Sequence, residues 1–347
     1  MSLLKTSKVA IITGASSNLG LNLGYRLIDE LSPETNLTII VTSRTLPRVQ
    51  EAITNLKQYG QAKEPRRTGQ LEFDYLLVDF TDMVSVLSAY YELTKHYKHI
   101  DYVFFNAVQA AFSGIDWMGA LKETLTNPMQ SVSNPTYKIQ RVGLKSQDGM
   151  GLVFQGNIFG PYYFIHKIKP LLKNGGRIIW ISSLMSGVDY LSFNDLQLIK
   201  SPLSYEGSKR MVDLMHFGTY KQLKSQDGID QYLVQPGIFT SYSFMQYLNP
   251  FTYYGMLLLF YIARWCGSPY HNISGYKAAQ APIRCAILEE VQDSKVGSGC
   301  DRFGKEITRY DYVDDTGKED VVKYLDILVK EWDEKLKDQI LNSRQII

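Results

Sequence analysis

The sequence has no excess of charge of either sign. It contains 37 lysines and arginines against 35 aspartates and glutamates, so the formal net charge of its 347 residues is +2. A basic excess would point to nucleic acid as a partner, and an acidic excess to a solvating tail. With 45% hydrophobic residues, the chain can build a buried core. We therefore expect a folded protein that does not bind nucleic acid.

Cysteine and histidine are scarce. The three cysteines (Cys266, Cys285 and Cys300) show no C-x-x-C spacing, and the five histidines show no H-E-x-x-H pattern. An odd, scattered set of cysteines argues against a disulfide framework and against a zinc site. We expect no metal in this protein.

Long apolar runs are missing as well. The longest continuous one, residues 251–263, falls short of the roughly 20 residues that a spanning helix needs. A strand-like run over residues 8–13 follows the N-terminus so closely that no signal peptide fits before it. We expect synthesis in the cytosol and a catalytic body that stays there.

What the sequence does contain is an alternation of apolar runs and helical periodicity. Strands are predicted at residues 9–13, 38–42, 75–78, 102–105, 177–181 and 232–234, all nearly apolar, as in parallel strands buried on both faces. Helices are predicted at 83–97, 150–172 and 204–223, and a leucine stripe from Leu19 to Leu31 predicts one more. This order predicts an α/β fold, a Rossmann-type doubly wound parallel sheet, as one domain over residues 1–347.

Three stretches extend this plan. Residues 126–149 are rich in turn residues, and residues 190–202 separate a strand from a helix. Long loops in compact domains are often functional, and surface decoration is the alternative. Residues 301–347 form a C-terminal extension, in which 318–341 predicts a surface helix that packs one apolar stripe on the domain.

A cofactor turn follows the first strand, in the sequence Thr13-Gly14-Ala15-Ser16-Ser17-Asn18-Leu19-Gly20. A glycine-rich turn that opens a helix can present backbone N–H groups and the helix dipole to a pyrophosphate. Its middle position is Asn18, and asparagine tolerates the left-handed region better than other non-glycine residues. The second strand ends in Ser43-Arg44, with Arg48 one turn on. Arginine at this position accommodates a 2′-phosphate, which favours NADPH over NADH.

The Y-x-x-x-K pattern at Tyr205 and Lys209 places both side chains on one helix face. Four other pairs show the same spacing, so context decides. Only Tyr205 follows a strand ending in Ser182-Ser183 and precedes one ending before Pro236-Gly237.

With these motifs the chain resembles the short-chain dehydrogenase/reductase superfamily. The resemblance implies a proton donor at Tyr205, a carbonyl-orienting hydroxyl at Ser183 and a cofactor-ribose ligand at Lys209. It also implies a water-linked proton relay at Asn157, adenine binding by Asp79 and support of the sheet by Asn106. The residues expected to bind the cofactor are Gly14, Ser16, Asn18, Leu19, Gly20, Ser43, Arg44, Asp79, Asn106, Ala107, Tyr205, Lys209, Pro236, Gly237 and Ser241.

This chemistry suits the residue types. Hydride addition to a ketone creates an alkoxide that needs a proton, and a nearby ammonium should lower the pKa of a tyrosine toward neutrality. The pattern departs from the superfamily at Asn18 and at Val108, where glycines are usual. The spacing from Ser183 to Tyr205 is also long, which leaves Ser182 or Ser186 as substitutes for Ser183.

Four stretches, residues 42–50, 134–140, 235–241 and 331–340, are similar to the fungal 3-keto-steroid reductases of ergosterol biosynthesis. This resemblance implies NADPH-dependent reduction of the C-3 ketone of a sterol intermediate during C-4 demethylation. It also implies work beside the other C-4 demethylation enzymes at endoplasmic reticulum and lipid-droplet membranes. The alternatives are a reductase of another lipid carbonyl, such as a steroid or retinoid, and a non-catalytic NADP-binding scaffold.

Within residues 239–270 we expect a substrate lid that contacts the membrane. The apolar run 251–263 is flanked by Tyr247, Tyr253, Tyr254, Tyr261 and Trp265, and such rings gather at membrane interfaces. Arg264 could pair with lipid headgroups. The alternative is a buried core helix. We favour a monotopic, cytosol-facing association through this segment.

Overall fold

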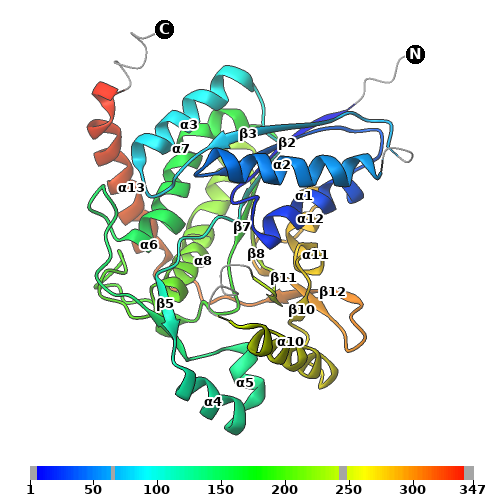
Figure 1. Cartoon of the computed structure of the whole chain (residues 1–347). Coiled ribbons are helices and arrows are strands. Elements are labelled where there is room, and N and C mark those ends of the chain that lie inside the picture. Colours follow the sequence, from blue (N-terminus) through cyan, green and yellow to red (C-terminus); the bar gives the residue numbers. More distant parts are fainter. Residues whose placement is uncertain (1–5, 64–66, 242–247, 340–347) are drawn as a thin grey trace.

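The computed structural model describes residues 6–63, 67–241 and 248–339. Its centre is an eight-stranded sheet in the order β12-β11-β8-β7-β4-β1-β2-β3 (Figure 1). All neighbouring strands in it are parallel except β12, which runs antiparallel to β11. The strands are β1 (Ser7–Ile12), β2 (Asn36–Ser43), β3 (Leu71–Leu77), β4 (Tyr102–Phe105), β7 (Arg177–Ile181), β8 (Asp230–Gln235), β11 (Lys295–Cys300) and β12 (Glu306–Asp311).

Helices cover both faces of this sheet. On one face lie α3 (Met83–His96), α7 (Gly160–Leu172), α8 (Ser204–Gln222) and α13 (Lys318–Lys335). On the other lie α1 (Asn18–Glu30), α2 (Leu46–Gln61), α11 (Gly275–Ala278) and α12 (Gln280–Ile287). Successive residues of β1 alternate between the two cores, since Ile11 joins the first while Ala10 and Ile12 join the second.

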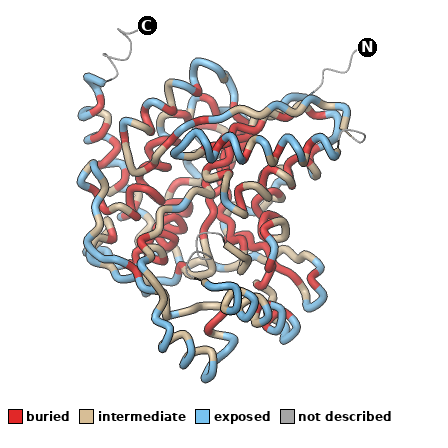
Figure 2. The backbone as a smooth tube through the Cα atoms, in the orientation of Figure 1, coloured by how far each residue is buried: buried red, intermediate tan, exposed pale blue. Residues whose placement is uncertain are grey.

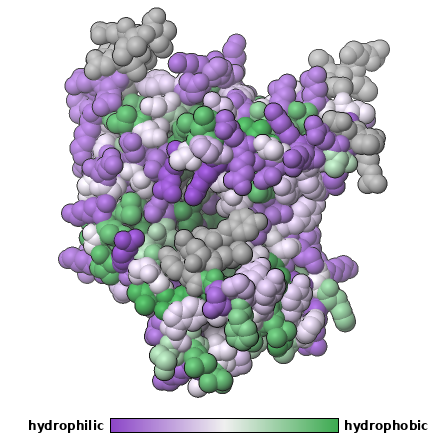
Figure 3. All heavy atoms as spheres, viewed as in Figure 1, coloured by the Kyte–Doolittle hydropathy of each residue, from purple (hydrophilic) through white to green (hydrophobic). Residues whose placement is uncertain are grey.

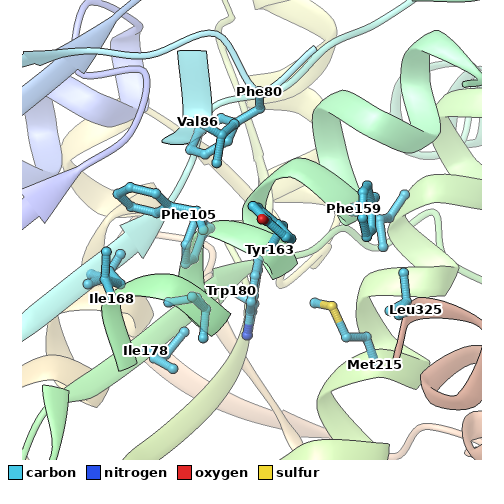
Figure 4. Close-up of a cluster of buried hydrophobic side chains, with 14 of the residues drawn as sticks. Phe80, Val86, Phe105, Phe159, Tyr163, Ile168, Ile178, Trp180, Met215 and Leu325 are labelled. Atoms are coloured by element: carbon cyan, nitrogen blue, oxygen red, sulfur yellow. The ribbon is translucent and has the colours of Figure 1, made fainter. Parts of the chain in front are cut away.

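The larger core is rich in aromatic side chains. Phe105 of β4 stacks on Trp180 of β7 with ring centroids 4.2 Å apart, and Tyr163 of α7 lies beside Phe159 (Figure 4). Met215 of α8 belongs to the same cluster, which is buried throughout. Burying each such side chain is worth roughly 1.5–3 kcal/mol, so this core fixes the frame on which the site is built.

A smaller lobe lies at one end of the molecule, at the bottom of Figure 1. It contains β5 (Phe112–Ile115) paired with β6 (Lys138–Gln140), and β9 (Ile238–Phe239) paired with β10 (His271–Ile273). Its helices are α4 (Trp117–Thr126), α5 (Pro128–Ser133) and α10 (Pro250–Trp265). Figure 2 shows that this lobe is far less buried than the sheet. The residues predicted to contact a membrane lie here, except Tyr247, which is outside the described residues.

The predicted doubly wound fold is confirmed, and all six predicted strands are found. One detail was wrong: β3 is the edge strand, and Tyr75 and Leu77 are 46% and 42% exposed rather than buried on both faces. The strands β11 and β12 were not predicted. The sequence of β11 contains two glycines, and a Cβ at Gly297 would lie 2.2 Å from Nε2 of Gln235 on the neighbouring strand. A glycine that makes room for the Gln235 side chain therefore replaces the apolar pattern there.

The helix predicted at 150–172 has three parts. A short turn, α6 (Leu152–Phe154), leads into a π-helix, η2 (Gln155–Phe159), and then into α7. The predicted helix at 204–223 is α8, which continues into a second π-helix, η4 (Leu223–Asp227). Single π-turns inside helices are frequent at functional sites.

The C-terminal extension is partly in the sheet, because β12 pairs with β11 along its whole length. Its helix α13 packs a buried stripe against α8, with Leu325 and Trp332 in the larger core. Asp333 then accepts hydrogen bonds from the Tyr163 hydroxyl and from Lys167 of α7. The predicted surface helix is therefore α13, which ends at Lys335 and packs as a layer of the domain; residues 340 and 341 of the prediction lie outside the described residues.

Candidate active site

The turn after β1 is built for close backbone approach. Gly14 has a φ of +64°, a conformation that L side chains rarely adopt, and a Cβ there would meet Cα of Ala107 at 3.0 Å. A Cβ at Gly20 would lie 2.4 Å from the Gly14 carbonyl oxygen. The Ser17 side chain caps α1 by accepting a bond from the Gly20 N–H. The N-terminus of α1 thus opens at the carboxyl end of β1, where an anion can bind.

Two asparagines hold this turn. The Asn106 side chain donates to the carbonyl oxygens of Thr13 at 2.9 Å and Gly14 at 3.1 Å. The expectation that Asn18 occupies the left-handed region was wrong, because Asn18 is the first residue of α1 and the left-handed residue of the turn is Gly14. The Asn18 amide instead donates to the Thr240 carbonyl at 2.6 Å. It therefore links the turn to the chain segment after β8.

The end of β2 and the turn after β1 line a common cavity. Arg44 and Arg48 line it and are exposed, and a guanidinium nitrogen of Arg44 donates to Oε1 of Gln109 at 3.3 Å. Asp79 lines it after β3, with Oδ1 accepting from the Thr81 hydroxyl and N–H. Two arginines near a helix N-terminus fit a dinucleotide that carries a 2′-phosphate.

These residues surround one large cavity of about 820 Å³ at the carboxyl ends of the strands. Of the residues predicted to bind the cofactor, those that line it are Gly14, Ser16, Asn18, Leu19, Ser43, Arg44, Asp79, Asn106, Ala107, Tyr205, Lys209, Pro236 and Ser241. Gly20 lies behind this wall, within the turn. Gly237 has a φ of +68°, and Asn272 fixes the segment by donating to the Pro236 carbonyl.

Tyr205 and Lys209 stand at the start of α8, on the cavity wall. The Lys209 ammonium lies 5.8 Å from the centre of the Tyr205 ring and donates to the Ile181 carbonyl at 2.7 Å. This bond holds Lys209 against the end of β7. Both groups therefore occupy one side of the cavity, within reach of a bound molecule.

The charge states are set mainly by burial. Burial lowers the pKa of Lys209 to about 8, Asp213 opposes this shift, and Lys295 adds to it. Burial also raises the pKa of Tyr205 to about 12, Glu206 adds to the rise, and a hydrogen bond from Ser183 opposes it. The expectation that Lys209 would bring the tyrosine toward neutrality was wrong for this structure. Tyr205 is a protonated phenol at neutral pH, which is the form that a proton donor needs.

Three serines follow β7, and their contacts differ. Ser183 contacts the Tyr205 hydroxyl, while its own oxygen accepts from the Met185 N–H at 3.0 Å. Ser182 donates to the Asp213 carboxylate, and Ser186 donates to the Ser183 carbonyl at 3.2 Å. Ser182 and Ser186 are thus occupied elsewhere, and Ser183 is the serine placed at the tyrosine.

The long spacing between Ser183 and Tyr205 corresponds to residues packed outside the site. Leu198 has a φ of +56° and lies against α8, where a Cβ at Gly207 would come within 2.7 Å of its Cδ2. Gly207 also faces the Tyr190 carbonyl at the same distance. The extra residues therefore wrap around the first turn of α8 and leave Ser183 beside Tyr205.

Sequence reasoning missed Gln140, which comes from β6 in the 126–149 insertion. Its amide nitrogen donates to the Glu206 carboxylate at 2.6 Å. Its oxygen accepts from the Tyr205 N–H at 3.0 Å and the Ser204 hydroxyl at 3.1 Å. Gln140 thus caps the first turn of α8. The available signal was its place in the stretch 134–140, through which the fungal resemblance was drawn.

Asn157 lies in the π-helix η2, behind the tyrosine. Its amide donates to the Ser208 hydroxyl at 3.0 Å and the Gln109 carbonyl at 2.8 Å, and its oxygen accepts from the Gln109 N–H. Ser208 in turn donates to the Tyr205 carbonyl at 2.6 Å. Asn157 therefore joins the loop after β4 to the helix that carries Tyr205.

An aromatic wall faces the tyrosine from the smaller lobe. The Phe112 ring centre lies 5.7 Å from that of Tyr205, and both residues line the cavity with Lys138. The Lys138 ammonium sits 5.8 Å from the Phe112 ring centre, and burial lowers its pKa. This side of the cavity can hold a flat, largely apolar molecule with a polar group at Tyr205.

Comparison with known sequences identifies the family to which this chain belongs. The profile of the short-chain dehydrogenases matches residues 8–249. The chain belongs to the short-chain dehydrogenase family. It is 64% identical over 345 residues to the 3-keto-steroid reductase of Candida albicans, covering 99% of this chain and 100% of that protein. The 3-keto-steroid reductase of Debaryomyces hansenii is 67% identical over 339 residues, at 98% coverage of both. That of Saccharomyces cerevisiae is 57% identical over 342 residues, at 97% and 98% coverage.

Solved structures of short-chain dehydrogenases share the fold at low identity. An NADPH-dependent reductase involved in bacilysin biosynthesis superposes with a TM-score of 0.55 at 15% identity, covering 84% of this chain and 94% of that one. The complex of RhlG with NADP from Pseudomonas aeruginosa gives 0.53 at 16% identity, covering 80% and 89%. These structures therefore share the fold of this chain.

Among the described residues, no group of three or more histidine, cysteine, aspartate or glutamate side chains is arranged to hold a metal ion. Cys285 and Cys300 are buried and Cys266 is exposed, and all three are free.

Proposed function

We propose that the protein is an NADPH-dependent 3-keto-steroid reductase, which reduces the C-3 ketone of a sterol intermediate to the 3β-hydroxyl during C-4 demethylation in ergosterol biosynthesis. The observation that carries this proposal is identity of 57–67% over almost the whole chain with proteins of that name. The cavity supports it, because Tyr205 and Phe112 line it and Ser183 contacts the Tyr205 hydroxyl.

Side chains of the protein supply the proton that the reduction needs. NADPH, when bound, supplies the hydride. The Tyr205 hydroxyl donates its proton to the carbonyl oxygen as negative charge develops there, and the Ser183 hydroxyl donates a hydrogen bond to the same oxygen. The Lys209 ammonium is held at the Ile181 carbonyl, 5.8 Å from the centre of the Tyr205 ring, where it can contact the bound dinucleotide. Gly14, Arg44 and Lys209 are the residues that would hold the dinucleotide.

The test is turnover of the purified protein with a 3-keto sterol and NADPH, followed by loss of NADPH absorbance and by mass spectrometry of the product. A panel with steroid and retinoid ketones separates the alternative substrates. Cells that lack the protein should accumulate a 3-keto sterol. A folded protein that binds NADPH but turns over none of these ketones would instead be the non-catalytic scaffold.

We also propose a peripheral, monotopic association with the cytosolic face of the endoplasmic reticulum and with lipid droplets, beside the other C-4 demethylation enzymes. No helix in residues 6–63, 67–241 and 248–339 is long and apolar enough to cross a membrane. The support is the apolar surface of the smaller lobe, seen at the lower end of Figure 3. On α10, Phe251 and Leu258 are 86% and 56% exposed, and on α4, Met118 and Leu125 are 76% and 75% exposed. Surfaces of this kind mark partner or membrane contacts.

The expectation that Arg264 pairs with lipid headgroups was wrong. Arg264 is buried and donates to the carbonyls of His271 and Asn272, so it does not face headgroups. Phe260 is buried in the lobe's own core against His271, so replacing it would test folding rather than attachment. The proper variant is Phe251→Glu/Leu258→Glu, with Lys330→Glu, at an exposed position of α13, as the matched control. If the folded double variant floats with membranes as the wild type does, α10 is not the anchor.

A further inference from the structure

A second buried lysine lies close behind the catalytic residues. Lys295 begins β11, its side chain is only 7% exposed, and its ammonium is paired with the carboxylate of Asp213, which is 0% exposed. Asp213 lies one turn beyond Lys209 on α8. A buried pair of this kind costs desolvation energy, and replacing both members by apolar groups is often harmless to stability. Its presence beside the site calls for a role other than stability.

The pair is tied to the loop that carries Ser183. The Lys295 ammonium donates to the Ser186 hydroxyl at 2.5 Å and to the Ser183 carbonyl at 3.2 Å. The other carboxylate oxygen of Asp213 accepts from the Ser182 hydroxyl. The Ser182 N–H is bonded to the Val234 carbonyl of β8. Serines on both sides of Ser183 are thus fixed by one ion pair that joins α8 to β11.

The same pair faces Lys209. The charged neighbours of Lys209 come from two elements, Asp213 on its own helix and Lys295 on β11, and they act on the lysine in opposite directions. From β7 it meets the Ile181 carbonyl, and on α8 the Tyr205 ring. His216, one turn beyond Asp213, is fully buried with its pKa lowered to about 4, so it adds no charge at neutral pH.

We propose that Lys295 and Asp213 are positioning residues for the reduction: they tether the Ser182–Ser186 loop so that Ser183 meets Tyr205, and together they hold the charge balance around Lys209. This inference rests on the proposed reductase function. It assigns a role in the reaction to a charge pair that is buried beside the site.

The charge balance makes opposite predictions for the two members. Lys295→Met removes a cation near Lys209 and leaves the Asp213 carboxylate, so the Lys209 pKa should rise. Asp213→Asn removes the carboxylate and leaves the Lys295 cation, so the Lys209 pKa should fall. Because reduction needs the Lys209 ammonium, activity is lost as pH rises through this pKa. The alkaline limb of the pH profile should therefore move up with Lys295→Met and down with Asp213→Asn, each by about one pH unit.

The tether makes a separate prediction. Ser186→Ala leaves both charges in place and removes one bond to the loop. It should lower kcat about tenfold without moving the alkaline limb, since Ser183 is less well placed. The double variant Lys295→Met/Asp213→Asn removes both charges and the tether. Its alkaline limb should return to near the wild-type position, and its kcat should be about tenfold below wild type, as for Ser186→Ala. Lys8→Met breaks the Lys8–Asp101 pair at the far end of β1 and should change neither kcat nor the limb.

The experiment is the pH profile of kcat with a 3-keto sterol and NADPH for these five variants, with folding checked by circular dichroism and NADPH binding by fluorescence. Opposite shifts of the limb support the proposal. Shifts in the same direction, or none, in folded variants of an active wild type overturn it. If a single charge variant does not fold, the double variant decides, because wild-type kcat in that variant contradicts the tether. An inactive wild type would instead refute the proposed function.

Discussion

Gln140 is the residue through which the 126–149 insertion reaches the reaction centre, and Gln140→Ala tests that connection. The variant removes a hydrogen bond to the buried Glu206 carboxylate and two bonds that end at Ser204 and Tyr205. Lost hydrogen bonds cost about 0.5–1.5 kcal/mol each, and a buried polar group left without a partner costs about 1–3 kcal/mol. We expect the free energy of unfolding to fall by about 2–4 kcal/mol.

The effect on catalysis should be larger than the effect on cofactor binding. Gln140 fixes the Tyr205 backbone, and a displacement of about 1 Å at a reacting group can cost about 100-fold in rate. We expect kcat to fall about 10- to 100-fold. The dissociation constant for NADPH should change little, because Gly14 and Arg44 lie just after β1 and β2, and the hydrogen bonds of Gln140 go to Ser204, Tyr205 and Glu206 instead. Denaturant unfolding, steady-state kinetics and fluorescence titration measure the three quantities.

Exchanging the side chains of Gln140 and Glu206 distinguishes a positioning role of Gln140 from a general loss of structure. The double variant Gln140→Glu/Glu206→Gln reverses donor and acceptor and keeps all three bonds, so it should recover most of the lost kcat. Gln130→Ala, which removes one bond to the Asn134 carbonyl in α5, should cost less than about 1 kcal/mol and leave kcat unchanged. Wild-type kcat in folded Gln140→Ala would refute the reasoning, and so would a double variant no better than the single one.

Three further predictions follow from the same geometry. Lys209→Ala should lower kcat about 100-fold and also weaken NADPH binding, since its ammonium faces both Tyr205 and the cavity; a loss confined to KM for the ketone would contradict this. Arg44→Asp should shift the ratio of kcat/KM for NADPH over NADH about tenfold or more toward NADH, and an unchanged ratio would make Arg44 an ordinary surface residue. Trp332→Ala should lower the free energy of unfolding by about 3–5 kcal/mol, measured by denaturant, against little change for the exposed Lys330→Ala; equal effects would mean that α13 is not part of the core.

The parts of the fold that could be predicted are those written in local patterns. Apolar runs gave the central strands, and the Leu19 stripe gave α1 with its buried face. Tyr205 and Lys209 are four residues apart on one helix, so their proximity is local and could be read from spacing and context. The strand β11 was not predictable in this way, because Gly297 sits where the Gln235 side chain packs against the strand and no apolar alternation marks it.

The parts of the site that escaped prediction depend on contacts between distant residues. Gln140 and Glu206 are 66 positions apart, and Asp213 and Lys295 are 82 apart. Neither pair shows any sequence periodicity, and each is formed only when the sheet brings an insertion or a late strand against α8. The charge state of Tyr205 was mispredicted for a similar reason, since the burial that dominates it is a property of the folded surroundings and not of the motif.

The role of Tyr205 as proton donor is tested most directly by a single-turnover measurement of Tyr205→Phe with NADPH and a 3-keto sterol. The substitution keeps the ring that packs near Phe112 and removes only the hydroxyl that meets Ser183. We expect a folded protein that binds NADPH as the wild type does and forms no detectable 3β-hydroxy sterol, while the wild type converts the ketone. Turnover by Tyr205→Phe within tenfold of the wild type would contradict the assignment of Tyr205 as the proton donor.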